Sequence, residues 1–133
     1  MKKIGHRAAK IIFSLILVMP ILGVLGVFPE PTRDLYNTDE AFIFIQVLSD
    51  AFFIMWMMAV VHILALFCLW TRRESLGALL VLPITLNVVG FHLVLDGGLF
   101  TAGASMADVM LLLNLYLLWK HKDILIALWQ QKA

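Results

Sequence analysis

His92 and Asp96 are the two residues of this chain whose types and spacing could most directly support chemistry. They are four residues apart in an apolar stretch, so a helix places both side chains on one face. A carboxylate beside an imidazole can relay a proton or hold a polar head group, and ionisable groups in membrane helices tend to mark pathways or binding sites. We expect Asp50 and Asp108 at the same level, which predicts a candidate polar cluster of His92, Asp96, Asp50 and Asp108.

Each acid of this cluster also has a structural interpretation, and the sequence leaves both open. Asp96 precedes two glycines, so it fits a hydrated helix end. Asp108 fits a capping box that begins at Ser105. Asp50 fits a position among the lipid head groups. His92 lies inside the apolar run, so its position is the most informative of the four.

Three further polar residues are expected deeper in the membrane. Asn87 and Asn114 should lie at similar depth on different helices, so we predict a hydrogen bond between them. His62 is predicted to bond a backbone carbonyl or another helix. We interpret all three as interhelical polar residues.

The sequence contains no motif of soluble enzyme chemistry. It lacks a phosphate-binding loop, a dinucleotide fingerprint, a His-Glu-x-x-His zinc motif and a nucleophile elbow. We therefore assign no catalytic residue and no metal ligand, and whether the chain is an enzyme stays open. The single cysteine, Cys68, has no partner for an internal disulfide and is expected to be buried among apolar neighbours.

The composition is typical of a membrane protein. Hydrophobic residues make up 62% of the 133 residues and charged residues 14%, whereas a soluble domain carries about 25% charged residues. The net charge of +1 provides no basic surface for nucleic acid. Membrane lipid is therefore the expected surrounding, and a homo-oligomer is compatible with it.

The apolar stretches predict four transmembrane helices in a single domain, over residues 10–28, 47–70, 76–96 and 103–120. An amphipathic tail follows over residues 121–133. The predicted fold is an all-α, integral membrane four-helix bundle. The second stretch exceeds one simple span, so its helix either begins outside the hydrocarbon or follows a short helix on the membrane surface.

The basic residues predict the orientation of these helices. Four of them precede or begin the first span, two follow Trp70 and three follow Trp119, while the other two loops hold Arg33 alone. By the positive-inside rule, both termini are expected on the cytoplasmic side of the inner membrane. Trp70 and Trp119 then lie at the same interface, as in an aromatic belt.

The third and fourth predicted helices resemble the DoxX family of small four-helix bacterial membrane proteins. The third helix carries the resemblance in Arg72, then Pro83, Ile84, Thr85, Leu86 and Asn87, then Phe91, His92 and Leu93. The fourth carries it in Leu115, Tyr116, Leu117, Leu118, Trp119 and Lys120, followed by Lys122 and Asp123. The family has a glutamate in the middle of the second helix, where this chain has no acid and His62 is the nearest ionisable residue.

The resemblance implies an inner-membrane protein that is a non-catalytic or quinone-side subunit of a membrane oxidoreductase complex. It implies a redox partner, and quinone as the lipophilic cofactor, with no cofactor intrinsic to the chain. Two alternatives stay open, a small proton-coupled carrier and a structural or lipid-binding membrane protein. A carrier requires a polar path through the bundle, for which the inner half offers only His62 and Asn114.

Overall fold

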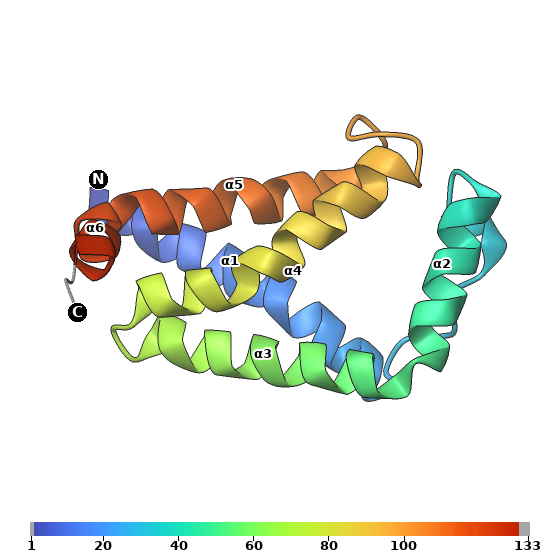
Figure 1. Ribbon diagram of the computed structural model, residues 1–133, viewed down its shortest axis with the longest axis horizontal. Helices are drawn as coiled ribbons and strands as arrows, with labels where there is room; N and C mark the ends of the chain where they lie inside the picture. Colours follow the sequence, from blue (N-terminus) through green and yellow to red (C-terminus); the bar gives the residue numbers. More distant parts are fainter. Residues whose placement is uncertain (1, 131–133) are drawn as a thin grey trace.

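The chain folds into helices and connecting loops, with no strand in residues 2–130, the part that our computed structural model describes (Figure 1). The all-α class is therefore confirmed. Residues 131–133 of the predicted tail lie outside the described residues. In chain order the elements are α1 (Lys2–Val24), η1 (Arg33–Leu35), α2 (Asp39–Asp50), α3 (Phe52–Trp70), α4 (Glu74–Val94), α5 (Ala104–Lys120) and α6 (Lys122–Gln130).

Three helices in the described chain are long and apolar enough to cross a membrane. They are Ile4–Val24 within α1, Phe52–Trp70, which is α3, and Glu74–Val94, which is α4. Their length and composition identify a membrane protein. The fourth predicted span corresponds to α5, whose 17 residues extend over only about 25 Å at the helical rise per residue.

The antiparallel hairpin of α3 and α4 is the centre of the fold. α1 packs along α3, and α5 packs along α4. Gly77 lets the two central helices approach closely, because a Cβ atom there would lie only 2.9 Å from the carbonyl oxygen of Ala65. Cys68 is buried in the same contact, as expected. The buried core draws on four helices through Phe13, Leu17, Ala65, Leu69, Ala78, Val81, Met110 and Leu117.

The first predicted helix, over residues 10–28, begins and ends earlier than expected. α1 already includes Lys2, so the basic residues ahead of the apolar run are part of the helix. It stops because Gly26 adopts a left-handed φ of +74°, and the amide of Val27 bonds the carbonyl of Leu22 at 3.0 Å. This is the usual arrangement of a glycine helix C-cap.

The second predicted helix, over residues 47–70, is broken into two. Thr38 caps the start of α2 by accepting a hydrogen bond from the Ala41 amide, and the helix ends at Asp50. Ala51, with a non-helical ψ of 63°, separates it from α3. Figure 1 shows α2 crossing the end of the molecule that lies away from α6 and the start of α1. Of the two alternatives for this stretch, the structure therefore has the separate short helix.

Candidate functional site

A mostly apolar pocket of about 650 Å³ lies between α2, α3 and α4. It exists because α2 turns away at Ala51, so that its apolar face stands opposite the central hairpin without closing against it. The size is within the range of small-molecule sites. Apolar side chains from all three helices form its walls, among them Phe44, Leu48, Met57, Val61, Ile84 and Phe91.

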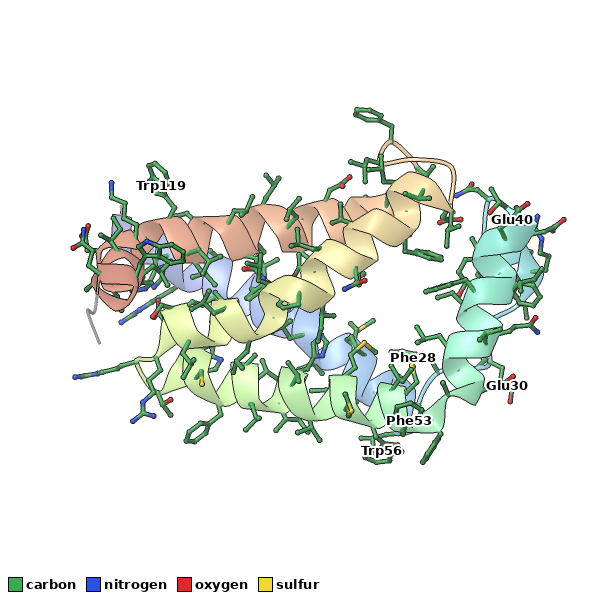
Figure 2. All side chains as sticks on the ribbon, in the orientation of Figure 1. Phe28, Glu30, Glu40, Phe53, Trp56 and Trp119 are labelled. Carbon is green, nitrogen blue, oxygen red and sulfur yellow. The ribbon has the colours of Figure 1, made fainter. Side chains whose placement is uncertain are left out.

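The pocket is distinct from the outward-facing surface of the bundle. Figure 2 shows Trp56 directed away from the bundle on α3, and Trp119 directed away from α5 near α6. Trp56 is 41% exposed and Trp119 is 72% exposed. Large apolar side chains on such an outward face suit contact with lipid, whereas the pocket walls face one another.

His92 supplies a polar group to this pocket and is backed by Asp96. Its Nδ1 lies 2.9 Å from Oδ2 of Asp96, whose side chain is almost fully buried. Because the carboxylate accepts from Nδ1, the neutral ring leaves Nε2 as a hydrogen-bond acceptor. No group within residues 2–130 forms a hydrogen bond with Nε2. The predicted helical spacing of this pair thus produces direct contact, with one ring nitrogen free for a ligand.

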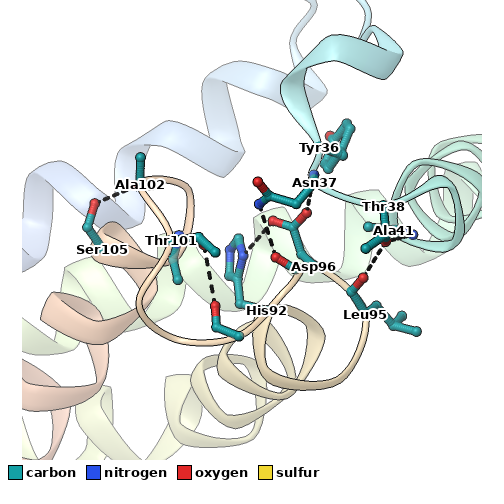
Figure 3. Close-up of polar contacts among 12 residues, drawn as sticks. Tyr36, Asn37, Thr38, Ala41, His92, Leu95, Asp96, Thr101, Ala102 and Ser105 are labelled. Carbon is teal, nitrogen blue, oxygen red and sulfur yellow. Dashed lines mark hydrogen bonds and ion pairs between the residues drawn. The ribbon is translucent and has the colours of Figure 1, made fainter.

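Asp96 also holds the beginning of α2 beside the end of α4 (Figure 3). Its Oδ1 accepts from the Asn37 amide at 2.8 Å, and its carbonyl accepts from the Asn37 side chain at 3.0 Å. The Thr38 hydroxyl donates to the carbonyl of Leu95. We call these contacts of Asn37 and Thr38 with Leu95 and Asp96 the latch. Gly97 follows with a left-handed φ of +84°, a conformation that glycine adopts without strain.

Tyr36 and Asn87 are the other polar residues of the pocket wall. Burial, together with the neighbouring Asp96 carboxylate, raises the pKa of Tyr36, so its phenol stays protonated and able to donate at neutral pH. The ring of Tyr36 packs edge-on against Phe91. The Asn87 side chain donates to the Pro83 carbonyl at 2.8 Å, so the amide oxygen is the part of Asn87 available to a ligand.

The predicted cluster of four ionisable residues reduces to His92 and Asp96. Asp50 is exposed at the far end of α2, and that helix of 12 residues separates it from the latch by about 18 Å. Asp108 lies on α5, and no hydrogen bond or ion pair within the described chain joins it to His92 or Asp96. Asp50 lies apart from the pair because α2 spans the width of the pocket between Asp50 and Asp96. A binding role for Asp50 or Asp108 stays a prediction.

The predicted hydrogen bond between Asn87 and Asn114 is wrong. Asn114 instead donates to the hydroxyl of Thr85 at 3.0 Å in the buried interface of α4 and α5. Thr85 and Asn87 are two residues apart, about 200° around a helix, so they face different neighbours. His62 is fully buried, and its Nδ1 lies 2.7 Å from the Met58 carbonyl, one of the two kinds of partner expected.

The sequence analysis missed a second polar cluster, at the opposite end of α4. Lys10 lies 2.9 Å from Oε1 of Glu74, while Nε2 of His6 and Nε2 of His121 lie 2.8 Å and 3.0 Å from Oε2. We call these four residues the Glu74 cluster. A signal was present in the sequence, because Glu74 follows two arginines at the end predicted to gather three basic segments.

Comparisons of the chain with protein-family models, with curated proteins and with solved structures found no match. The resemblance to the DoxX family therefore stays a prediction. Within residues 2–130, no group of three or more His, Cys, Asp or Glu side chains is arranged to hold a metal ion. The pocket, the latch and the Glu74 cluster are the features that bear on function.

Proposed function

We propose that this protein binds a small lipophilic molecule in the pocket, as a non-catalytic, quinone-side subunit of a membrane oxidoreductase complex. The observation that carries the proposal is the apolar pocket of about 650 Å³ whose wall includes His92, held by Asp96 with Nε2 free. The DoxX resemblance supports the same class of protein through Asn87 and the Phe-His-Leu sequence around His92.

The polar groups of the pocket suit a neutral head group with carbonyl or hydroxyl oxygens. Tyr36 can donate a hydrogen bond, whereas the amide oxygen of Asn87 and Nε2 of the neutral His92 ring can accept one. None of the described lining residues is lysine or arginine, so a phosphate or carboxylate would enter without a counter-charge. A quinone can accept from Tyr36 through a ring oxygen, and its reduced form, the quinol, can donate through its hydroxyls to Asn87 and to Nε2 of His92. The apolar tail that both forms share suits the walls of the pocket.

The proposal includes four membrane helices, with α5 as the fourth and both termini cytoplasmic in the inner membrane. Its support is that α5 packs along α4 and α1, and that the Glu74 cluster joins α1, the start of α4 and the C-terminal end of α5 at one end. That end carries the basic residues that the positive-inside rule places in the cytoplasm.

A reporter insertion tests this orientation. Alkaline phosphatase inserted after Gly98, in the loop between α4 and α5, is expected to be active, because this enzyme works only outside the cytoplasm. The same enzyme fused after Gln130 is expected to be inactive. The opposite pattern would reverse the proposed orientation. Activity at both sites would show that α5 does not cross the membrane.

The alternative of a structural or lipid-binding protein has one observation in its favour. Both oxygens of the Asp96 carboxylate are already bonded within the protein, as expected for a residue that only stabilises the fold. An acyl chain could then fill the apolar walls without contacting His92. The identity of the extracted molecule and its dependence on His92 separate this alternative from quinone binding.

Mass spectrometry of the gently solubilised protein tests the proposal. The expected result is a co-purifying quinone, together with a stoichiometric redox subunit. Val88 lines the pocket, so Val88→Trp should fill it and abolish the quinone. Leu86 lies two residues away on α4 and is 54% exposed, so Leu86→Trp is the matched control and should retain the quinone.

The other outcomes of this experiment are equally informative. Phospholipid in place of quinone, lost in Val88→Trp alone, would favour the lipid-binding alternative. A protein that carries nothing, and does not bind an added benzoquinone with a decyl tail, would refute the proposal. Loss of quinone in both tryptophan variants would show binding at the outer surface of α4 and not in the pocket.

A further inference from the structure

We propose that α2 is a hinged lid over the pocket, and that Asp96 couples closure of this lid to the contact between a ligand and His92. This inference rests on the ligand-binding function proposed above and concerns how the same site is regulated. Three observations support it. α2 is held mainly at its two ends, few of its residues are buried, and the Asp96 carboxylate contacts both Asn37 and His92.

The hinge is the single residue between two helices. Ala51 joins α2 to α3 and has a non-helical backbone. Rotation about this one residue can therefore change the angle between the two helices. α2 packs chiefly against α3, the helix to which it is joined. Only Ala41 of its 12 residues is buried, so core packing contributes little to holding α2 in place.

The latch holds the other end. Asn37 and Thr38 bond to Asp96 and Leu95 through three hydrogen bonds, and all three join the residues before α2 to those after α4. Between hinge and latch, α2 turns Phe44 and Leu48 toward the pocket. If the latch opens, rotation about Ala51 removes this wall and opens the pocket to the lipid.

The Asp96 carboxylate connects the latch to the ligand. Oδ1 accepts from the Asn37 amide on the lid, and Oδ2 contacts Nδ1 of His92 on the pocket wall. A hydroxyl that donates to Nε2 draws positive charge onto the imidazole and strengthens its bond to the carboxylate. This orients Asp96 toward Asn37. A ligand that engages His92 therefore stabilises the closed lid, and an empty site leaves the lid freer to open.

The first test needs no ligand. Cys68→Ala removes the native thiol, and Val88→Cys places a single reporter in the pocket. Asn37→Ala weakens the latch by removing one of its three hydrogen bonds, that of the Asn37 side chain to the Asp96 carbonyl. It is expected to speed reaction of this reporter with N-ethylmaleimide about fivefold. Asp108→Asn on α5 is the control and should leave the rate unchanged. Equal rates with and without Asn37→Ala would overturn the lid.

A disulfide across the latch gives the converse test. A Cβ atom at Gly97 would lie 3.4 Å from that of Asn37, close to the separation of about 3.8 Å in disulfides. In Asn37→Cys/Gly97→Cys, oxidation is expected to slow release of a decyl-benzoquinone about tenfold or more. A cysteine at position 97 strains the left-handed backbone in both redox states, so the reduced form of the same protein is the reference. Reduction should restore release. Identical release before and after reduction would overturn the lid.

Hydrogen exchange tests the coupling. The reduced form of decyl-benzoquinone, whose hydroxyl can donate to Nε2 of His92, is expected to slow amide exchange in α2 severalfold in the unmodified protein. Asp96→Asn keeps the shape of the side chain but not its charge, so it should bind this reduced form without slowing α2. Equal slowing in both proteins would overturn the role of Asp96. If the reduced form binds to neither protein while Asn37→Ala still exposes Val88→Cys, the proposed ligand is wrong and the lid stands.

Discussion

The two ends of α4 each carry a carboxylate that joins distant segments, but they do so with different partners. Glu74, the first residue of α4, is bonded by the side chains of Lys10, His6 and His121. Asp96, just after the helix, is bonded by one side chain, that of His92, and by the backbone amide of Asn37. One end is held by side chains alone, and the other by a backbone amide together with one side chain.

This difference corresponds to a difference in packing. At the Glu74 end, side chains of α1 and of His121, which lies between α5 and α6, contact one carboxylate at the start of α4. At the Asp96 end, the latch holds α2 across a gap, and the pocket remains beneath it. A bonded carboxylate alone therefore does not identify a site; the open space beside His92 does.

The largest expected effect is that of Asp96→Ala on stability. It leaves the amide of Asn37 and Nδ1 of His92 without their acceptor, and a backbone amide cannot turn toward water. We expect the free energy of unfolding to fall by about 3 kcal/mol, measured by thermal unfolding in detergent. A loss no larger than that of Glu74→Gln would remove the contrast between the two ends.

Glu74→Gln should have a smaller effect. The amide can still accept a hydrogen bond, and Lys10 and the two histidines can reorient toward the membrane surface, so we expect a loss of about 1 kcal/mol in the free energy of unfolding. Binding of decyl-benzoquinone should be unchanged, because the cluster lies at the other end of α4. Weakened binding would mean that the two ends are coupled.

A matched pair of histidine substitutions compares the ends as binding sites. His92→Phe keeps a ring of similar size and removes Nε2, so the Kd for the reduced, hydroxyl-bearing form of decyl-benzoquinone should rise about tenfold, or about 1.4 kcal/mol. His121→Phe makes the same change in the Glu74 cluster and should leave the Kd unchanged. Fluorescence titration measures both values, and equal Kd values for the two variants would argue against His92 as a ligand contact.

The smallest expected effect lies between the two ends, in the interface of α4 and α5. A double-mutant cycle of Thr85→Val with Asn114→Leu should give a coupling energy of about 0.6 kcal/mol. The cycle of Asn87→Leu with Asn114→Leu should give none, because these two side chains have different partners. A larger coupling energy for Asn87 with Asn114 than for Thr85 with Asn114 would support the hydrogen bond between the two asparagines that the sequence analysis predicted.

Much of the fold was predictable because it depends on local chemistry. Long apolar runs predict membrane-crossing helices, and the structure has helices of that length in α1, α3 and α4. The contact between His92 and Asp96 follows from their spacing on one helix. Burial of Cys68 follows from its apolar neighbours.

The candidate site was predictable only in part. His92 was identified because an ionisable residue within an apolar run is costly. Asp50 and Asp108 were grouped with it by membrane depth alone, and depth does not determine lateral separation within a bundle. Tyr36 and Asn37 carried no recognisable signal, because both belong to a polar loop whose position depends on the helices around it.

The sequence by itself therefore determined the all-α class, the membrane surroundings and the pairing of His92 with Asp96. Each follows from residues within a few turns of one another, where helical geometry leaves little freedom. Tertiary structure alone decided the break at Ala51, the partner of Asn114, the Glu74 cluster and the pocket. These depend on how helices rotate and cross when they pack, and small changes in packing bring different side chains together.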